Sequence, residues 1–333
     1  MNLPEYTPLV SIGIPVYNGE KTIEKTLKRI TNQDYKNIEV IVSDNCSTDF
    51  TVSIAEKIAR EDSRVKVYKS NENRGLIWNF NRVFSLAEGE YFMWASHDDE
   101  HSIEFVSSCI EIMRGNPNIA LCAPNVVATW EKDESEIWMS SLESFSDKGN
   151  LELRYSETLR NFPAVAIYGV YQSSLVKKTK LMPHAMGGDL LFIQNLSLYG
   201  KFVGLNQHLF TYRQRFKWNS VSEDFQVFFA GKNKPKFYSP FIVFSYWQYK
   251  ILFGSDITTR LKSKLFLELV KYQSAQLFLK LLLKIIRIAL PSEIGSRLAK
   301  SIYWKWIHND NVQVLDANKY EERVIEPVLQ ISR

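Results

Sequence analysis

Short apolar runs alternate with amphipathic segments along the first 130 residues of the chain. The apolar runs predict buried strands, and segments whose apolar residues recur every three or four positions predict helices. The predicted strands are residues 9–16, 38–43, 65–68, 91–95 and 119–127. The predicted helices are residues 20–33, a segment capped by Thr48 or Asp49 that ends near Arg60, and residues 76–86 and 104–113. This alternation predicts an α/β fold with a doubly wound, mostly parallel sheet flanked by helices.

The second half of the chain is less regular. Residues 131–149 are polar and acidic and predict a loop. A helix over 152–161, a short strand over 167–172, a helix from Gly187 to about Tyr199 and a strand over 201–214 follow. After a loop over 215–240 the chain becomes predominantly helical. At 333 residues it exceeds what one core usually serves, so we expect two units, residues 1–230 and a mainly helical extension over 231–333.

Composition narrows the class of protein. A hydrophobic content of 45% with 13% aromatics is typical of a globular protein, and a net charge of +4 is too small to indicate nucleic-acid binding. Cys46, Cys109 and Cys122 are too few and too scattered for a disulfide framework or a zinc site. Without a signal-peptide pattern or an apolar run of about 18 residues, we expect a cytoplasmic location.

Polar side chains with recognisable chemistry stand at the predicted strand ends. The strand over 91–95 runs into Asp98 and Asp99, and the carboxyl ends of strands are where open α/β sheets bind ligands. Two adjacent acids can hold a divalent cation or simply form an acidic turn. Tyr17 after the first strand offers a flat face to a nucleobase or closes the core edge. Asp44 after the second can accept a hydrogen bond from a ring N–H or cap a helix.

The order and spacing of four motifs resemble the family 2 glycosyltransferases. The motifs are Ile-Pro-Val-Tyr-Asn at 14–18, Ser-Asp-Asn-Cys-Ser-Thr-Asp at 43–49, Asn-Arg-Gly at 73–75, and the Gly-Glu-Tyr strand ending in Asp98-Asp99. The resemblance spans residues 8–215. It implies a GT-A fold and an inverting transfer of one sugar from a nucleotide-diphosphate sugar, with UDP favoured, to a hydroxyl of a saccharide or lipid-linked acceptor.

The resemblance also implies donor-binding roles, position by position. Pro15 and Tyr17 should frame the nucleobase, and Asp44 should accept a hydrogen bond from it. Arg74 should approach the diphosphate, although a solvated loop arginine is the alternative. Asn81 matches an asparagine of the family whose role is either structural or in binding.

Two further residues carry the expected chemistry. Asp98 should ligate a divalent cation, Mn²⁺ or Mg²⁺, and Asp99 is a weaker candidate, turned toward the backbone or the acceptor. Ser96 stands where the family's Asp-x-Asp-Asp motif has its first acid, which puts the strength of metal binding in question. Asp189, in Gly-Gly-Asp at the start of a predicted helix, resembles the family's general base; an ordinary helix N-cap is the alternative.

The C-terminal region raises the question of partners. Between residues 261 and 305 nine Lys or Arg stand against two Glu, and Lys280, Lys284 and Arg287 share one face of a predicted helix. Such a helix can lie on an anionic membrane, which would place the protein on the inner membrane face. Alternatively, it packs on the first unit or on a second subunit of a homo-oligomer.

Two remaining segments are compatible with the same family. Tyr168-Gly169-Val170-Tyr171 resembles an acceptor-side segment, and Arg213, Arg215 and Lys217 form a basic cluster.

Ser96 motivates a competing hypothesis, a non-catalytic degenerate transferase that acts as a binding or scaffold subunit in polysaccharide assembly. A dehydrogenase is excluded because no Gly-x-Gly-x-x-Gly follows the first strand. Nucleotidyl transfer is disfavoured because no glycine-rich phosphate loop opens the chain.

Overall fold

The computed structural model describes residues 7–130, 134–142, 150–160, 164–214, 227–230, 239–289 and 312–314. In chain order, its elements are β1 (Val10–Val16), α1 (Ile23–Thr31), β2 (Ile38–Asp44), α2 (Thr51–Glu61), β3 (Val65–Lys69), α3 (Leu76–Ser85), β4 (Tyr91–Trp94), β5 (Glu100–His101), α4 (Phe105–Met113), β6 (Ile119–Trp130), β7 (Glu136–Ser140), α6 (Leu151–Arg160), η1 (Ala164–Tyr168), β8 (Val170–Gln172), α7 (Ser173–Val176), α8 (Gly188–Leu196), β9 (Lys201–Gln214), α10 (Pro240–Gly254), α11 (Thr259–Ala289) and β10 (Val312–Val314).

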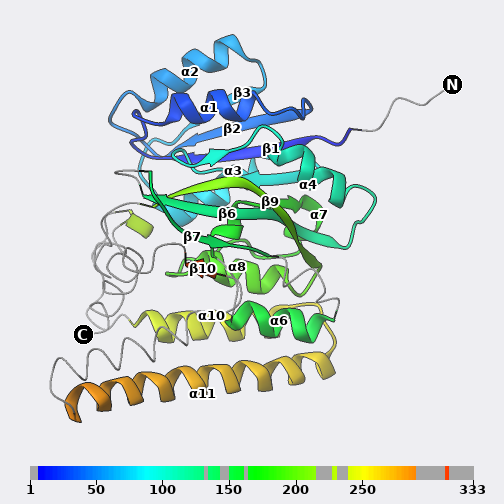
Figure 1. Cartoon of the computed structure of the whole chain (residues 1–333), viewed down its shortest axis with the longest axis vertical. Coiled ribbons are helices and arrows are strands. Elements are labelled where there is room, and N and C mark those ends of the chain that lie inside the picture. Colours follow the sequence, from blue (N-terminus) through cyan, green and yellow to red (C-terminus); the bar gives the residue numbers. More distant parts are fainter. Residues whose placement is uncertain are drawn as a thin grey trace.

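One mixed sheet organises the molecule (Figure 1). Its main path runs β10-β7-β6-β8-β4-β1-β2-β3, with β9 paired to β6 and β5 paired to β9. The four strands β3, β2, β1 and β4 are parallel, as the strand–helix alternation predicts. The later strands add antiparallel pairs, among them β4 with β8 and β6 with β7. The α/β prediction is therefore confirmed: the N-terminal half forms the run of four parallel strands, and β6 and β9 form a further parallel pair.

Helices cover both faces of the parallel strands. Ile23 and Leu27 of α1 are fully buried against alternate residues of β1, and α3 packs on the other face. This second contact is unusually close at Gly13, where an added Cβ would stand 2.8 Å from the Cβ of Val83. A side chain at residue 13 would therefore push α3 away from the strand end that it supports.

The sheet does not follow chain order beyond β4. The three-residue strand β8 lies between β4 and β6, although it comes after both β6 and β7 in the chain. The 14-residue strand β9 then runs parallel to β6 over most of its length. Inside the segment 131–149, for which the sequence predicts a loop, the structure places β7 at the edge of β6. That prediction is wrong because pairing with β6 decides the conformation there.

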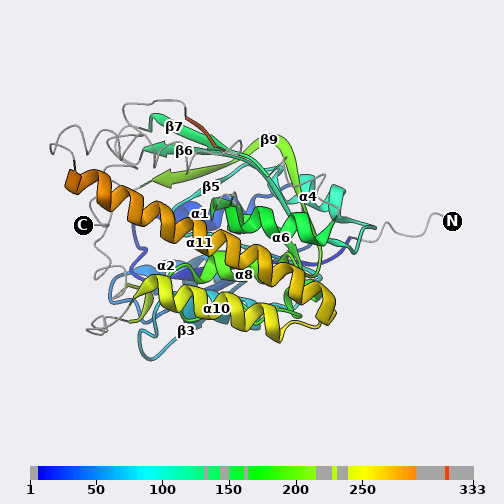
Figure 2. The ribbon, with the colours of Figure 1, turned by 90° about the horizontal axis from the view of Figure 1, so that it is seen from below.

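The helices α6 and α10 lie side by side below α8, and α11 runs beneath them (Figures 1 and 2). Leu252, Leu265 and Leu269 are fully buried in a shared core with α6. A chain of buried glutamines joins three helices: Gln248 donates to Gln194 of α8 at 3.0 Å, and Gln273 of α11 donates to Gln248 at 2.9 Å. No helix within the described ranges combines the length and apolar character that a transmembrane span requires.

Candidate donor and acceptor site

Three strand ends meet at one edge of the sheet. Val16 at the end of β1 is in register with Asp44 at the end of β2, and the Asn45 N–H donates to the Val16 carbonyl at 2.9 Å. On the other side of β1, the Ala95 N–H donates to the Gly13 carbonyl at 2.9 Å. The loops that follow β1, β2 and β4 therefore leave the sheet side by side, where parallel sheets form their ligand sites.

The first two of these loops are joined directly. Asn18 accepts a hydrogen bond from the Thr48 N–H at 2.8 Å, and its own N–H donates to the Ser47 hydroxyl at 2.8 Å. Between β1 and this junction, Tyr17 exposes 45% of its surface, whereas Pro15 is buried in the strand. Tyr17 thus presents an open aromatic side chain at the sheet edge, and Pro15 supports the strand that leads to it.

Asp44 is almost completely buried and closes its own turn. Both carboxylate oxygens accept from the Ser47 N–H, at 3.0 and 3.3 Å. Because a carboxylate can accept about four hydrogen bonds, this turn leaves acceptor capacity for a ligand. Asp44 does not cap α2, which begins only at Thr51, so the helix-cap alternative does not describe its contacts.

Asn79 supports the site although no sequence motif singles it out. Its amide donates to the carbonyls of Ser43 at 2.8 Å and Val16 at 3.3 Å, and its carbonyl oxygen accepts from the Ser43 hydroxyl at 2.6 Å. Asn79 thus fixes the ends of β1 and β2 relative to each other. Asn81, the residue that the motifs indicate, instead exchanges two hydrogen bonds with the backbone of Met182, at 2.9 and 3.0 Å, and ties α3 to the turn before α8.

Arg74 stands on the loop between β3 and α3 and is half exposed. Its guanidinium lies 4.4 Å from the centre of the Trp78 ring, and its backbone N–H donates to Asn45 at 3.0 Å. Asn45 also donates to Asn73 at 2.9 Å, so the loop that carries Arg74 is held against the end of β2. Stacking on a tryptophan orients a guanidinium while leaving its N–H groups accessible.

Asp98 and Asp99 face different partners. Asp98 is partly buried and accepts a hydrogen bond from the hydroxyl of Ser96. Asp99 is buried, and its Oδ1 accepts from the backbone N–H of Arg213 in β9 at 2.9 Å, which matches the backbone-facing expectation. In the described parts of the chain no three acidic, histidine or cysteine side chains group as a metal site. A cation at Asp98 would therefore need oxygens from a ligand as well.

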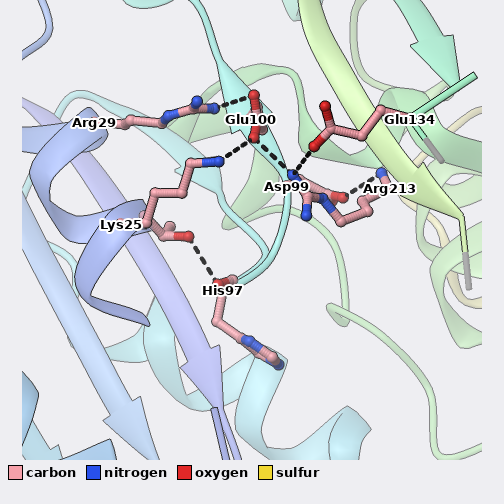
Figure 3. Close-up of polar contacts among 8 residues, drawn as sticks. Lys25, Arg29, His97, Asp99, Glu100, Glu134 and Arg213 are labelled. Carbon is pink, nitrogen blue, oxygen red and sulfur yellow. Dashed lines mark hydrogen bonds and ion pairs between the residues drawn. The ribbon is translucent and has the colours of Figure 1, made fainter. Parts of the chain in front are cut away.

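Glu100 holds the loop after the acids in place (Figure 3). Its carboxylate pairs with Lys25 at 2.8 Å and with Arg29, both on α1, and with Arg213 at 2.8 Å. Burial alone would raise the pKa of Glu100, but the hydrogen bonds from Lys25 and Arg29 outweigh it and hold the pKa at about 2. Arg213 is thus engaged with the acidic loop, and its expected basic companions Arg215 and Lys217 lie outside the described residues.

Asp189 lies in the first turn of α8, two residues after Gly187. Burial raises its pKa above the usual value, against hydrogen bonds from the Leu190 N–H and its own. The phenol of Tyr168 links it to the other acids: burial raises the pKa of Tyr168, and the charges of Asp99, Asp98 and Asp189 raise it further. Three carboxylates, two from the loop after β4 and one from α8, therefore act on one tyrosine.

Gly187 sets the direction in which α8 begins. It has a φ of +75°, a left-handed conformation that L side chains rarely adopt, and an added Cβ would stand 2.9 Å from the Phe244 ring of α10. Tyr171, at the end of the segment 168–171 that resembles an acceptor-side segment, is fully buried and packs edge-on against Trp94 at 5.1 Å. Its side chain faces the core between β4 and α8, so Tyr168 is the tyrosine of this segment that can face a ligand.

Open α/β sheets bind their ligands outside the carboxyl ends of the strands, which is where this chain places Asp44, Asp98 and Asp99. The family model for "Glycosyl transferase family 2" matches residues 11–181, which is more than half of the chain. The chain therefore belongs to glycosyl transferase family 2, as the motifs indicate.

Curated relatives agree with this assignment. A Campylobacter jejuni protein named GalNAc(5)-diNAcBac-PP-undecaprenol beta-1,3-glucosyltransferase is 27% identical over 57% of this chain and 60% of its own length. An uncharacterized glycosyltransferase of Haemophilus influenzae is 27% identical over 63% of this chain and 66% of its own length. The chain thus spans less than two thirds of the length of either relative.

Two solved structures resemble the fold. Staphylococcus aureus TarS 1–349 in complex with UDP-GlcNAc superposes with a TM-score of 0.55 at 19% identity, over 80% of this chain and 72% of that one. The mannosyltransferase PcManGT of Pyrobaculum calidifontis, solved with GDP-Man and Mn²⁺, gives a TM-score of 0.52 at 15% identity, over 99% and 87%. The expected GT-A type fold with a helical C-terminal region is thereby confirmed.

Proposed function

We propose that this protein transfers a single sugar from a nucleotide-diphosphate sugar, UDP-linked by preference, to a hydroxyl of a saccharide or lipid-linked acceptor, with inversion. The observation that carries the proposal is the placement of Asp44 and of the loop with Asp98 at neighbouring strand ends, together with Tyr168, whose pKa is raised by the charges of both Asp98 and Asp189. Membership in glycosyl transferase family 2 supports the reaction class. The UDP-GlcNAc complex of TarS supports the donor class, and the undecaprenol named for the Campylobacter relative supports a lipid-linked acceptor.

The donor would lie across the ends of β1, β2 and β4. Tyr17 offers an exposed ring for the base, with Pro15 in the strand behind it, and the remaining acceptor capacity of Asp44 suits a ring N–H. Arg74, whose guanidinium stacks on Trp78, would approach the diphosphate. Because an arginine fork matches phosphate oxygens, this residue would hold the leaving group in a fixed orientation.

Asp98 is the side chain that would hold a divalent cation, Mn²⁺ or Mg²⁺, together with the diphosphate oxygens. When bound, such a cation would neutralise charge on the departing nucleoside diphosphate. The residues present fit a cation only if the diphosphate supplies ligands as well. The described part of the chain has no cluster of three ligating side chains. Ser96, which donates a hydrogen bond to Asp98, occupies the position where an acid would be a second ligand.

Asp189 is the proposed general base. It would accept the proton of the acceptor hydroxyl as that oxygen forms its bond to the anomeric carbon and the bond to the diphosphate breaks. Burial raises the pKa of Asp189, which increases the affinity of its carboxylate for a proton. Tyr168, whose pKa is raised by the charges of Asp98, Asp99 and Asp189, would border the acceptor.

The division into a catalytic domain over residues 1–230 and a helical region over 231–333 also remains a proposal, as does a peripheral location on the inner membrane face. A homo-oligomer through the helical region is the alternative use of those helices.

Calorimetric titration with UDP, GDP and dTDP, each with and without Mn²⁺, tests the donor site. Release of UDP from a panel of UDP-sugars in the presence of undecaprenyl-diphosphate saccharides tests transfer, and the anomeric configuration of the product tests inversion. Metal-dependent UDP binding with turnover is the expected result. Binding without turnover with any sugar or metal would favour the competing hypothesis of a non-catalytic scaffold subunit, which Ser96 motivates.

A further inference from the structure

The long helix α11 is apolar on two opposite faces. Its inner face carries Leu265 and Leu269, both fully buried, and Leu279 and Leu283, which are nearly so. Packing against α6 and α10 uses this inner face. A helix with apolar residues on opposite faces is normally buried on both of them. In this structure α11 lies at the bottom of the molecule, and no other described element lies beneath it (Figures 1 and 2).

The second apolar stripe is exposed. We call it the α11 outer face; it consists of the apolar residues Leu267, Val270, Leu277, Phe278, Leu281 and Ile285, with the small polar Ser274 between Val270 and Leu277. The spacing of three and four residues places them along one side of the helix. Phe278 exposes 68% of its surface, and Leu267 and Leu281 expose 57% each. Over its 31 residues the helix is about 46 Å long, so the stripe is far larger than an isolated exposed leucine.

Basic residues border this face. α11 contains one acidic residue, Glu268, and seven basic ones, namely Arg260, Lys262, Lys264, Lys271, Lys280, Lys284 and Arg287. Glu268 is turned to its own subunit, where it pairs with Arg160 of α6 at 3.2 Å and with Lys271 at 2.8 Å. The outer face therefore combines apolar side chains with exposed basic residues, among them Arg260, Lys271 and Lys284, whereas Lys264 pairs with Glu152 of α6 at 2.7 Å.

We propose that the α11 outer face docks on the surface of an anionic lipid bilayer, with the helix lying in the plane of the interface. Leu277, Phe278 and Leu281 would enter the boundary between headgroups and acyl chains, while Lys271 and Lys284 contact lipid phosphates. The helix lies on the membrane rather than across it, since none of the described helices qualifies as a span.

A second copy of the chain fits this face less well. A symmetric dimer through the α11 outer face would bring two like-charged borders together, and the one acid of the helix is already paired within its subunit. An anionic bilayer instead offers charge of the opposite sign along the whole helix.

This inference extends the proposed lipid-linked acceptor and in that respect rests on the proposed function, but its readout, vesicle binding, needs no turnover.

The test is flotation of the full chain with vesicles of phosphatidylcholine mixed with phosphatidylglycerol, compared with vesicles of phosphatidylcholine alone. We expect binding to the anionic vesicles. Phe278→Glu and Leu281→Glu should each lower the partition coefficient about tenfold or more, and Lys284→Gln about fivefold. Ile112→Glu is the matched control, because Ile112 is an exposed apolar residue of α4, away from α11, and its replacement should leave binding unchanged.

Three outcomes would overturn the proposal. Wild-type protein that does not float with anionic vesicles, or Phe278→Glu protein that floats equally well, would refute lipid docking. Light scattering that gives a dimer for the wild type and a monomer for Phe278→Glu would assign the face to a second copy instead. Each variant is also titrated with UDP, because none of the substitutions touches the proposed donor site. A variant that binds UDP as the wild type does but no longer binds vesicles has lost lipid docking alone. Absence of UDP binding in every protein would instead count against the proposed function.

Discussion

The hydroxyl of Ser96 donates a hydrogen bond to Oδ1 of Asp98. In the family motif that the chain resembles, an acid stands in place of this serine. The serine therefore orients the single carboxylate proposed as metal ligand but contributes no negative charge. The strength of the cation site should depend on this one position.

Ser96→Asp is the substitution that tests this dependence. A second carboxylate beside Asp98 should raise the Mn²⁺-dependent affinity for UDP by about tenfold, measured by calorimetry at fixed metal concentration. Without metal the two like charges should repel and lower the melting temperature. Ser96→Ala, which removes the hydrogen bond but adds no charge, is the control. Equal metal dependence in the Ser96→Asp and wild-type proteins would contradict the assignment of the cation to this loop.

Asp189→Asn should lower kcat by about 10²–10⁴-fold if the carboxylate acts as general base, with the affinity for UDP unchanged. Burial raises the pKa of Asp189, so the ionised carboxylate destabilises the folded state at neutral pH. The uncharged side chain of Asp189→Asn should therefore not lower the melting temperature. Activity requires the ionised form, so kcat/KM should rise with pH through a midpoint above 3.8. A variant that keeps wild-type turnover would exclude Asp189 as the base.

Glu100→Gln should reduce stability in a pH-dependent way. The folded-state pKa of about 2 lies below the ordinary value of 4.5, so the ion pairs stabilise the fold above pH 4.5 and this contribution is lost as the pH falls toward 2. At neutral pH the substitution should lower the free energy of unfolding by about 1–3 kcal/mol, measured by urea denaturation. Below the folded-state pKa the two proteins should converge, and a difference that is constant with pH would argue against the ion pairs as its source.

Gly187→Ala should impair both folding and the proposed base. The left-handed conformation is about 1–2 kcal/mol unfavourable for alanine, and the new Cβ would also meet the Phe244 ring. Gly115→Ala is a matched control, because Gly115 has a φ of +78° and no atom within 4 Å of an added Cβ. Gly187→Ala should therefore lose more stability than Gly115→Ala and also lower kcat. Equal losses would mean that the contact with α10 contributes nothing.

The parallel half of the sheet and the polar residues at its edge could be predicted from the sequence, since both depend on local patterns. Alternation of apolar runs and amphipathic segments is set by neighbours in the chain, and strand ends follow from it. The side chains that support the edge could not be found in this way. Asn79 and Asn81 both lie in α3, and only the three-dimensional packing reveals that Asn79 joins the strand ends while Asn81 binds Met182.

Long-range pairing explains the remaining differences. β7 forms within an acidic stretch because β6 offers a partner, and Tyr171 is buried because β8 lies between two other strands. The two-sided apolar character of α11 is visible in the sequence. Which side faces solvent follows only from its packing on α6 and α10.

The position of β8 has a consequence for shortened forms of this chain. Within the described sheet, β4 has β1 on one side and β8 on the other, and its four residues Tyr91–Trp94 are all buried. A fragment that stops before Val170 would leave β4 as an open, apolar edge strand, which is a template for intermolecular pairing. Soluble expression should therefore begin only with fragments that extend past β8 and β9, to Gln214 or beyond. During synthesis on the ribosome, β4 would remain an unpaired edge of the parallel strands until the segment with β8 and β9 has emerged.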